Sequence, residues 1–268
     1  EKMNKVMIPL FYALFLVLAV RVFTLGNASA GYRYLFVPDW SALLQVKTWV
    51  YALGQAFFSL SLAGTGTVVY GSYLREDQDI PASARTIALF DTLAALLAAL
   101  VIIPAVFAYG LDPASGPPLM FITMPTVFQQ MPGGSVFMIV FFVAVLLAAL
   151  TSLVNLFETP IEALQTYFGL GRKPAVGIVA AVSAAVGVCI EGIVSSWMDV
   201  CSIYLCPLGA LMAAVMLFWV CGSKYAREHA QRGAARPLGK WFEPAGKYVF
   251  CGVTLLVLVL GILYGGIG

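Results

Sequence analysis

The alternation of long apolar stretches with short polar ones along the chain predicts a bundle of membrane-crossing helices. Seven apolar stretches are each long enough to cross roughly 30 Å of hydrocarbon at about 1.5 Å of rise per helical residue. They cover residues 6–24, 48–73, 84–109, 135–168, 174–192, 199–221 and 245–267. The pattern therefore predicts an all-α membrane protein with seven transmembrane helices, which form a single transmembrane domain over residues 1–268.

The composition agrees with a membrane protein and disfavours several other classes. Of the 268 residues, 61% are hydrophobic and only 10% are charged, which is too little charge for the surface of a soluble domain of this size. The five cysteines lack the paired spacing of a metal site. Because the sequence also contains no nucleophile elbow, phosphate loop or basic stripe, we expect neither an enzyme nor a nucleic-acid partner.

The distribution of basic residues over the loops predicts the orientation in the cell membrane. Twelve of the 15 lysines and arginines fall on one side of the predicted spans, and three fall on the other, namely Arg21, Arg33 and Lys47. Loops rich in Lys and Arg stay in the cytoplasm. The N-terminus is therefore expected to be cytoplasmic and the C-terminus to be outside. Because the chain starts at Glu1 without an initiator methionine, we also expect a fragment of a longer protein.

The centre of the second span, SLSLAGTGTVVYG at residues 59–71, is a weak point for a helix. Gly64 and Gly66 each lower the helix propensity by about 1 kcal/mol, and hydroxyl side chains surround them. A break would free carbonyl groups, which suit a small cation, and N–H groups, which suit an anionic ligand group. A seam of small residues that lets two helices pack closely explains the same residues. The segment alone leaves both interpretations open.

The fourth span carries a polar stripe along one helix face. Ala148, Thr151, Ser152 and Asn155 are spaced at i, i+3, i+4 and i+7, and residues 158–162 continue the stripe with two carboxylates. Hydroxyl and carbonyl oxygens are hard ligands that alkali cations accept. Each Ser or Thr can also bond back to the backbone of its own helix, but a stripe that ends in two carboxylates weakens that explanation.

Two aspartates stand out in or beside the spans. Asp91 lies about two turns into the third span, where a carboxylate is costly and usually faces a bundle interior or an ion path. Asp199 opens the sixth span, where a solvated acid at a helix N-terminus is at least as good an explanation as a functional one.

Three segments resemble the neurotransmitter:sodium symporter family, bacterial branch. GQAFFSLSLAGTGTVVYGSYLREDQDI (54–80) resembles the sixth helix and following loop of the family, FITMPTVFQQMPGG (121–134) its fourth outer loop, and LLAALTSLVNLFETPIEAL (146–164) its eighth helix. The resemblance runs over the family's fifth to eleventh helices, so the first four are expected to be missing. It implies a leucine-transporter-like fold, here as part of an inverted-repeat architecture.

The resemblance also implies roles for individual residues. For the substrate site it implies Phe58, Ser59, Ser61, Gly64, Thr65, Ser152 and Leu156. For the first sodium ion it implies Ser59 and Asp91, and for the second Ala148, Thr151 and Ser152. For the gates it implies Phe58 as an aromatic lid, Asp199 as the acid of the outer gate, and Tyr73 as the tyrosine of the inner gate.

The sequence departs from the family pattern in ways that refine these expectations. Gly64, or Thr65, replaces an aromatic residue of the unwound segment, which would leave room for a bulky apolar or aromatic amino acid. Thr166 replaces the aspartate of the inner gate, with Glu162 one turn earlier. Chloride-dependent members carry a serine near Ala95, whereas here Asp91 supplies a fixed negative charge, so no chloride requirement is expected.

The predicted function is therefore a sodium-coupled symporter of an amino acid or related amine that works by alternating access. It would use two sodium ions and would need the missing N-terminal helices to complete both ion sites. A sodium- or proton-coupled transporter of another family with the same fold is an alternative. A seven-helix receptor is a weaker one, because a cytoplasmic N-terminus and a broken second span do not fit it.

Overall fold

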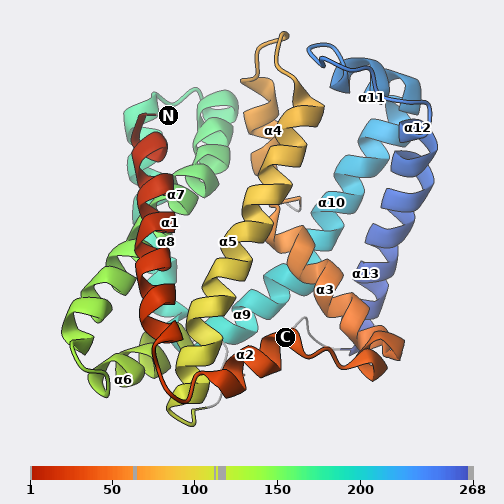
Figure 1. The fold of residues 1–268 in the computed structure, drawn as a ribbon. Helices are drawn as coiled ribbons and strands as arrows, with labels where there is room; N and C mark the ends of the chain where they lie inside the picture. Colours follow the sequence, from red (N-terminus) through yellow and green to blue (C-terminus); the bar gives the residue numbers. More distant parts are fainter. Residues whose placement is uncertain (1, 63–64, 112, 114–118, 265–268) are drawn as a thin grey trace. The chain divides into compact units, whose positions relative to one another are not determined.

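The structure is all-helical, as the apolar pattern predicts. The computed structural model describes residues 2–62, 65–111, 113 and 119–264, and every regular element in this part of the chain is a helix (Figure 1). Contacts divide the chain into two compact units. The first consists of Glu1–Trp40 and Thr92–Leu156, and the second of Ser41–Asp91 and Phe157–Gly268.

The first unit is built around one apolar core. Its elements are α1 (Lys2–Phe23), α2 (Ser29–Phe36), the second part of α5 (Ile80–Ala108), the π-helical turn η2 (Leu119–Thr123), α6 (Met124–Gln129) and the first part of α7 (Gly134–Phe168). Phe128 and Phe141 are fully buried in this core, with ring centroids 5.4 Å apart. Gly31 lies directly against the backbone of Pro104, so α2 approaches α5 where any side chain would clash.

The second unit is held together by smaller clusters. Besides the remaining parts of α5 and α7, it contains η1 (Trp40–Leu44, from Ser41), α3 (Val46–Ser59), α4 (Thr65–Ser72), α8 (Arg172–Cys189), η3 (Glu191–Ile193), α9 (Val194–Val200), η4 (Cys201–Leu205), α10 (Cys206–Val215), η5 (Met216–Val220), α11 (Ser223–Ala230), α12 (Phe242–Pro244), η6 (Ala245–Phe250) and α13 (Cys251–Tyr264). Phe57, Ala210 and Val257 join α3, α10 and α13 in one buried cluster.

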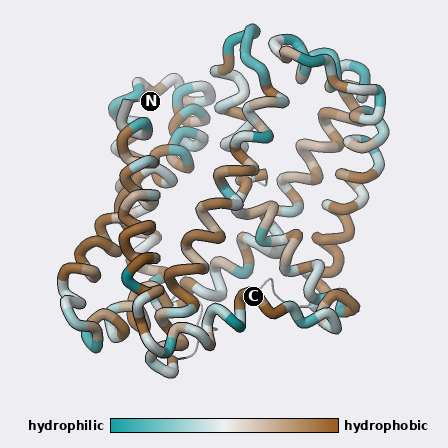
Figure 2. The backbone as a smooth tube through the Cα atoms, in the orientation of Figure 1, coloured by the Kyte–Doolittle hydropathy of each residue, from teal (hydrophilic) through white to brown (hydrophobic). Residues whose placement is uncertain are grey.

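Several helices are suited to a membrane. Five stretches in the described part of the chain are long and apolar enough to cross one, namely Lys5–Phe23, Ile80–Ala108, Gly134–Phe168, Arg172–Cys189 and Phe242–Tyr264. A sixth results if Cys206–Val220 and Ser223–Ala230, which meet at a bend of 103°, form one span. Figure 2 shows hydrophobic residues predominating along α1, α5 and α13. The count of seven spans stays a prediction.

The second predicted span is broken near its centre, as the sequence predicts. α3 ends at Ser59 after 14 residues, and α4 begins at Thr65 and has only 8. Neither half is long enough to cross the hydrocarbon alone, which is why the span is missing from the five. Gly64, one of the two glycines on which the prediction depends, lies outside the described residues.

A capping turn explains where α3 stops. Ser61 has φ of +52°, and among the described residues it is the only one besides glycine with a positive φ. Its N–H donates to the carbonyl of Phe58 at 3.0 Å, and the N–H of Leu62 donates to the carbonyl of Phe57 at 3.0 Å. These two bonds form a Schellman motif, in which a left-handed residue ends the helix and satisfies its last carbonyls.

We expect Ser61→Val to destabilise the protein relative to Ser61→Gly by about 1–2 kcal/mol, because a left-handed φ is costly for residues with a Cβ atom and most costly for β-branched ones. Thermal unfolding of the purified complete protein would measure the difference. Ser183, an exposed residue inside α8, is the control, since glycine should be the worse of the two substitutions there. The same order at both positions would contradict the capping role of Ser61.

Candidate functional site

Ser59 and Asp91, 32 residues apart in the sequence, are in direct contact in the second unit. Ser59 is the last residue of α3, and Asp91 lies within α5. The Ser59 hydroxyl donates a hydrogen bond of 2.6 Å to Oδ1 of Asp91. A hydroxyl oxygen and a carboxylate therefore meet at the C-terminal end of a helix, where backbone carbonyls also carry partial negative charge. This combination of hard oxygen atoms and negative potential suits a small cation.

The neighbouring residues expected at the substrate site lie on both sides of the break. Phe58 precedes Ser59, and its side chain is 45% exposed. Ser61 occupies the left-handed position of the capping turn, and Thr65 is the first residue of α4. Gly64 falls outside the described residues, so the interruption is described at both ends and not at its middle.

The residues expected at the second sodium ion lie on α7 within the first unit. The Thr151 hydroxyl donates to the carbonyl oxygen of Ala148 at 2.8 Å, so these two oxygen atoms are adjacent. This is the bond back to the helix that sequence reasoning keeps open as an alternative. Ser152 and Leu156 are exposed one and five residues further along the same helix, and Leu156 is 66% exposed.

Tyr73 is anchored to the polar stripe of α7 in the second unit. Its hydroxyl lies 3.0 Å from Oε2 of Glu162 and 3.4 Å from Oε1 of Glu158. Because a phenol has one proton to donate, the shorter contact to Glu162 is the stronger hydrogen bond. Thr166 donates to the other oxygen of Glu162 at 3.3 Å. Thr166 thus occupies the place where an aspartate is expected, and Glu162, one turn earlier on α7, supplies a carboxylate there.

Arg172 completes this polar group, and sequence reasoning did not single it out. It is the first residue of α8, and its guanidinium binds both oxygens of Glu158 at 2.9 and 2.8 Å. The bidentate geometry is the strongest form of an Arg–carboxylate contact. The available signal was a basic residue directly after a short turn that follows a helix with two carboxylates in its last third.

α4 also packs close to the same part of α7. A Cβ atom on Gly66 would lie 3.5 Å from Oγ1 of Thr159, an ordinary contact distance. Gly66 therefore faces the polar stripe of α7. The two explanations that the sequence leaves open for the glycines both apply, since the small residues accompany a helix break and also line a helix contact.

Asp199 lies inside a helix and not at its start. α9 begins at Val194, so Asp199 is the second-last residue of that helix and is half-buried. The boundary expected at residue 199 was wrong for the helix, because the preceding segment IVSSW continues the helical hydrogen bonding. Asp199 is therefore too far from the first turn of α9 for its charge to interact favourably with the N-terminus of that helix.

Comparisons with known proteins identify relatives over the whole described chain. The model of the Sodium:neurotransmitter symporter family matches residues 2–264. The uncharacterized sodium-dependent transporter YhdH of Bacillus subtilis is 44% identical over 158 residues, or 59% of this chain and 35% of that protein. An uncharacterized sodium-dependent transporter of Methanocaldococcus jannaschii is 32% identical over 257 residues, or 91% of this chain and 52% of that protein.

A solved structure shows the same fold. The crystal structure of MhsT in complex with L-phenylalanine superposes with a TM-score of 0.84 at 31% sequence identity. The match covers 96% of this chain and 62% of that chain. The chain therefore spans about a third of the length of the Bacillus subtilis relative, about half that of the Methanocaldococcus jannaschii relative and less than two thirds of the solved structure.

We expect Arg172→Gln to lower the stability of the protein by about 1 kcal/mol, because the substitution leaves the Glu158 carboxylate, only 12% exposed, without its partner. Thermal unfolding of the complete protein would measure the loss. Arg75→Gln is the matched control, since Arg75 and Asp77 are 84% and 70% exposed and their ion pair should contribute little.

A second substitution separates the ion pair from the side-chain volume. Adding Glu158→Gln to Arg172→Gln removes the unpartnered carboxylate and should restore part of the stability. Equal losses for Arg172→Gln and Arg75→Gln would show that the ion pair of Arg172 with Glu158 contributes no more than an exposed ion pair.

Proposed function

Because the chain belongs to the sodium:neurotransmitter symporter family, a family of secondary transporters and not of enzymes, we propose that the complete protein carries an amino acid or a related amine across the cell membrane together with sodium ions. Binding alternates between two sides of the membrane, as in an alternating-access transporter. The observation that carries the proposal is the contact of Ser59 with Asp91 at the end of a helix that stops inside an apolar span. Membership of this family disfavours the two alternatives, a seven-helix receptor and a transporter of another family.

The first sodium ion binds where α3 stops. The Ser59 hydroxyl oxygen and an Asp91 carboxylate oxygen lie 2.6 Å apart, so only a small movement of the hydroxyl proton is needed for both to face one cation. Backbone carbonyls at the end of α3 supply further oxygen ligands. The negative charge of Asp91 offsets the positive charge of the ion at a depth where water is scarce.

The second sodium ion binds on α7. The carbonyl oxygen of Ala148 and the hydroxyl of Thr151 are adjacent, and Ser152 follows on the same stripe. On ion binding, the Thr151 hydroxyl would turn its proton away from the carbonyl, and both oxygens would face the cation. Because there are two separate groups of oxygen atoms, we propose two sodium ions. The described residues supply only part of the ligands of each ion.

The substrate is a bulky apolar or aromatic amino acid. Gly64 or Thr65 stands where relatives carry an aromatic residue, which leaves the volume of a ring for the ligand side chain. MhsT, which is 31% identical, was crystallised with L-phenylalanine, and this agrees with a large side chain. Phe58 is the aromatic lid and Ser61 lies on the unwound segment. For Ser152 and Leu156 of α7, the substrate-binding role rests on the resemblance to the family alone.

The gates lie at opposite ends of the pathway. Tyr73 forms the inner gate with Glu162 as its hydrogen-bond partner, and Glu162 takes the place of the aspartate that Thr166 replaces. Asp199 is the acid of the outer gate. The N-terminus is cytoplasmic and the C-terminus outside, because 12 of the 15 lysines and arginines fall in the segments that the predicted spans assign to the N-terminal side.

Asp91 makes transport independent of chloride. Two unit charges about 4 Å apart interact by roughly 4 kcal/mol at an effective dielectric constant near 20, so the fixed negative charge of Asp91 can stabilise a sodium ion without a bound anion. We expect wild-type uptake to persist when chloride is replaced by gluconate. Asp91→Asn should raise the sodium concentration for half-maximal uptake about tenfold or more.

Asp77→Asn is the control for this experiment, because Asp77 is an exposed loop residue outside the proposed site. Its sodium dependence should equal that of the wild type. A loss of wild-type uptake without chloride, or a normal sodium dependence of Asp91→Asn, would rule out this role of Asp91 while leaving the assignment to the family intact.

Competition between amino acids tests the substrate class. We expect tryptophan, tyrosine, phenylalanine or leucine to displace a bound labelled substrate at concentrations about tenfold or more below those of alanine, because a void beside a small ligand forfeits packing contacts. Thr65→Phe should narrow this difference by refilling the space. Tighter binding of alanine than of the aromatic amino acids would refute the proposed pocket size.

A further inference from the structure

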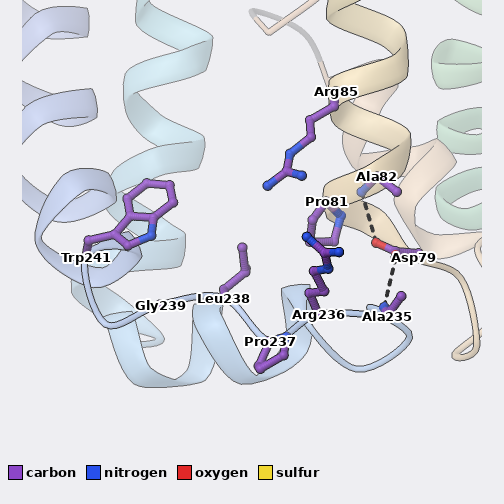
Figure 3. Close-up of a pocket in the computed structure, with 10 residues that line it drawn as sticks. All are labelled: Asp79, Pro81, Ala82, Arg85, Ala235, Arg236, Pro237, Leu238, Gly239 and Trp241. Carbon is purple, nitrogen blue, oxygen red and sulfur yellow. Dashed lines mark hydrogen bonds between the residues drawn. The ribbon is translucent and has the colours of Figure 1, made fainter.

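A cavity lies apart from the proposed transport site, at the end of the second unit where α5 begins. Its volume is about 280 Å³, and the first turns of α5 and the loop between α11 and α12 line it. Figure 3 shows the guanidinium groups of Arg85, from α5, and Arg236, from the loop, both pointing into this space, with the indole of Trp241 at its far side. Leu238 adds an apolar wall.

Asp79 joins the two walls of the cavity. One of its carboxylate oxygens accepts the N–H of Ala82 at 2.9 Å, which caps the start of α5. The other accepts the N–H of Ala235 at 2.9 Å, which anchors the loop. The Ala235 N–H first, and then the Ala82 N–H, hold the pKa of Asp79 below its usual value. Two backbone N–H groups therefore already stabilise its negative charge.

Close packing also fixes the loop two residues before Ala235. Gly233 lies against the backbone of Asp77 and Gln78, where a Cβ atom would clash. The loop is thus attached to the segment before α5 at two places, one through glycine and one through Asp79. Because both attachments involve the backbone, the cavity is a built feature of the fold and not a gap between exposed side chains.

Asp79, whose charge interacts with that of Arg85, compensates the two arginines of the cavity only in part. Neither forms an ion pair with a carboxylate of the residues that the structure describes. Other basic residues of the same region have partners: Lys224 pairs with Glu228, Arg232 pairs with Glu76, and Lys247 lies over the ring of Trp219. With Asp79, the lining carries a net positive charge of one.

The position of the cavity relates it to the membrane surface. The apolar stretch Ile80–Ala108 begins beside it, and the apolar stretch Phe242–Tyr264 begins directly after Trp241. Trp241 is 65% exposed, as is common for tryptophans at the level of lipid headgroups. Two spans therefore start at the rim of a basic cavity, which is where headgroup phosphates lie.

The geometry points to a binding site for a phosphate group, supplied by the headgroup of an anionic phospholipid. Arg85 and Arg236 would each donate two parallel hydrogen bonds to phosphate oxygens, which is the recognition mode that the guanidinium fork favours. The Trp241 ring and Leu238 would contact the glycerol and the first acyl carbons. A bound headgroup would tie the start of α5 to the loop before α13, independently of substrate and sodium.

Binding of defined lipids to the complete protein in detergent tests the site. Short-chain phosphatidylglycerol, short-chain phosphatidylcholine and inorganic phosphate would be added at equal ionic strength, and the unfolding midpoint recorded. We expect phosphatidylglycerol to raise the midpoint more than the other two, because a ligand of the native state stabilises it by mass action. Arg85→Gln/Arg236→Gln should weaken the apparent affinity for phosphatidylglycerol about tenfold or more.

Arg75→Gln/Lys224→Gln is the matched control, since it removes two positive charges from exposed positions of the same unit outside the cavity. Its affinity for phosphatidylglycerol should equal that of the wild type. If the arginine double variant does not fold, Leu238→Glu tests the same point by placing a carboxylate in the cavity, and it should reduce the affinity likewise.

Three results would overturn the proposal. Unchanged affinity of Arg85→Gln/Arg236→Gln or of Leu238→Glu would show that the cavity does not bind phosphate. Equal weakening in the control variant would show that only the overall charge attracts the lipid. Binding of inorganic phosphate as tightly as phosphatidylglycerol would show that free phosphate, and not a lipid headgroup, is the ligand.

Discussion

A helix that stops inside an apolar span leaves backbone groups that lipid cannot satisfy, and this constraint determines the arrangement around α3 and α4. The Schellman turn at Ser61 satisfies two of the freed carbonyls. The contact of Ser59 with Asp91 brings a carboxylate to the same place. Carbonyls, a hydroxyl and a fixed charge are together costly in a bilayer, so their concentration here supports the proposal that the break binds ions and substrate.

Local signals were sufficient to predict the break, because glycine and hydroxyl residues act within a few positions of the chain. They did not predict which residue would adopt the left-handed conformation. Glycine was the natural candidate by propensity, yet Ser61 is left-handed, because the cap forms directly after the last residue of α3. The cost of Asp91 could be read from its depth, whereas its pairing with Ser59 depends on how two helices pack.

The pairing of Glu158 with Arg172 shows the same limit for the polar stripe. The periodicity of α7 placed Glu158 and Glu162 on one face, but periodicity within one helix says nothing about a partner on the next. The helix start expected at Asp199 was placed too late, because IVSSW contains no glycine or proline that would interrupt a helix beginning soon after Gly192. Side-chain partners across elements are set by tertiary packing, which a single sequence does not reveal.

The short connection between α7 and α8 gives the Arg172 ion pair a particular character. Only three residues separate the two helices, and the left-handed Gly169 makes the reversal tight. An arginine on such a hairpin travels with the carboxylate it binds whenever the hairpin moves. Its contact with Glu158 therefore acts as a permanent counter-charge. The neighbouring Glu162 is held only by the hydroxyl groups of Tyr73 and Thr166, so it is the carboxylate that can exchange partners in the proposed transport cycle.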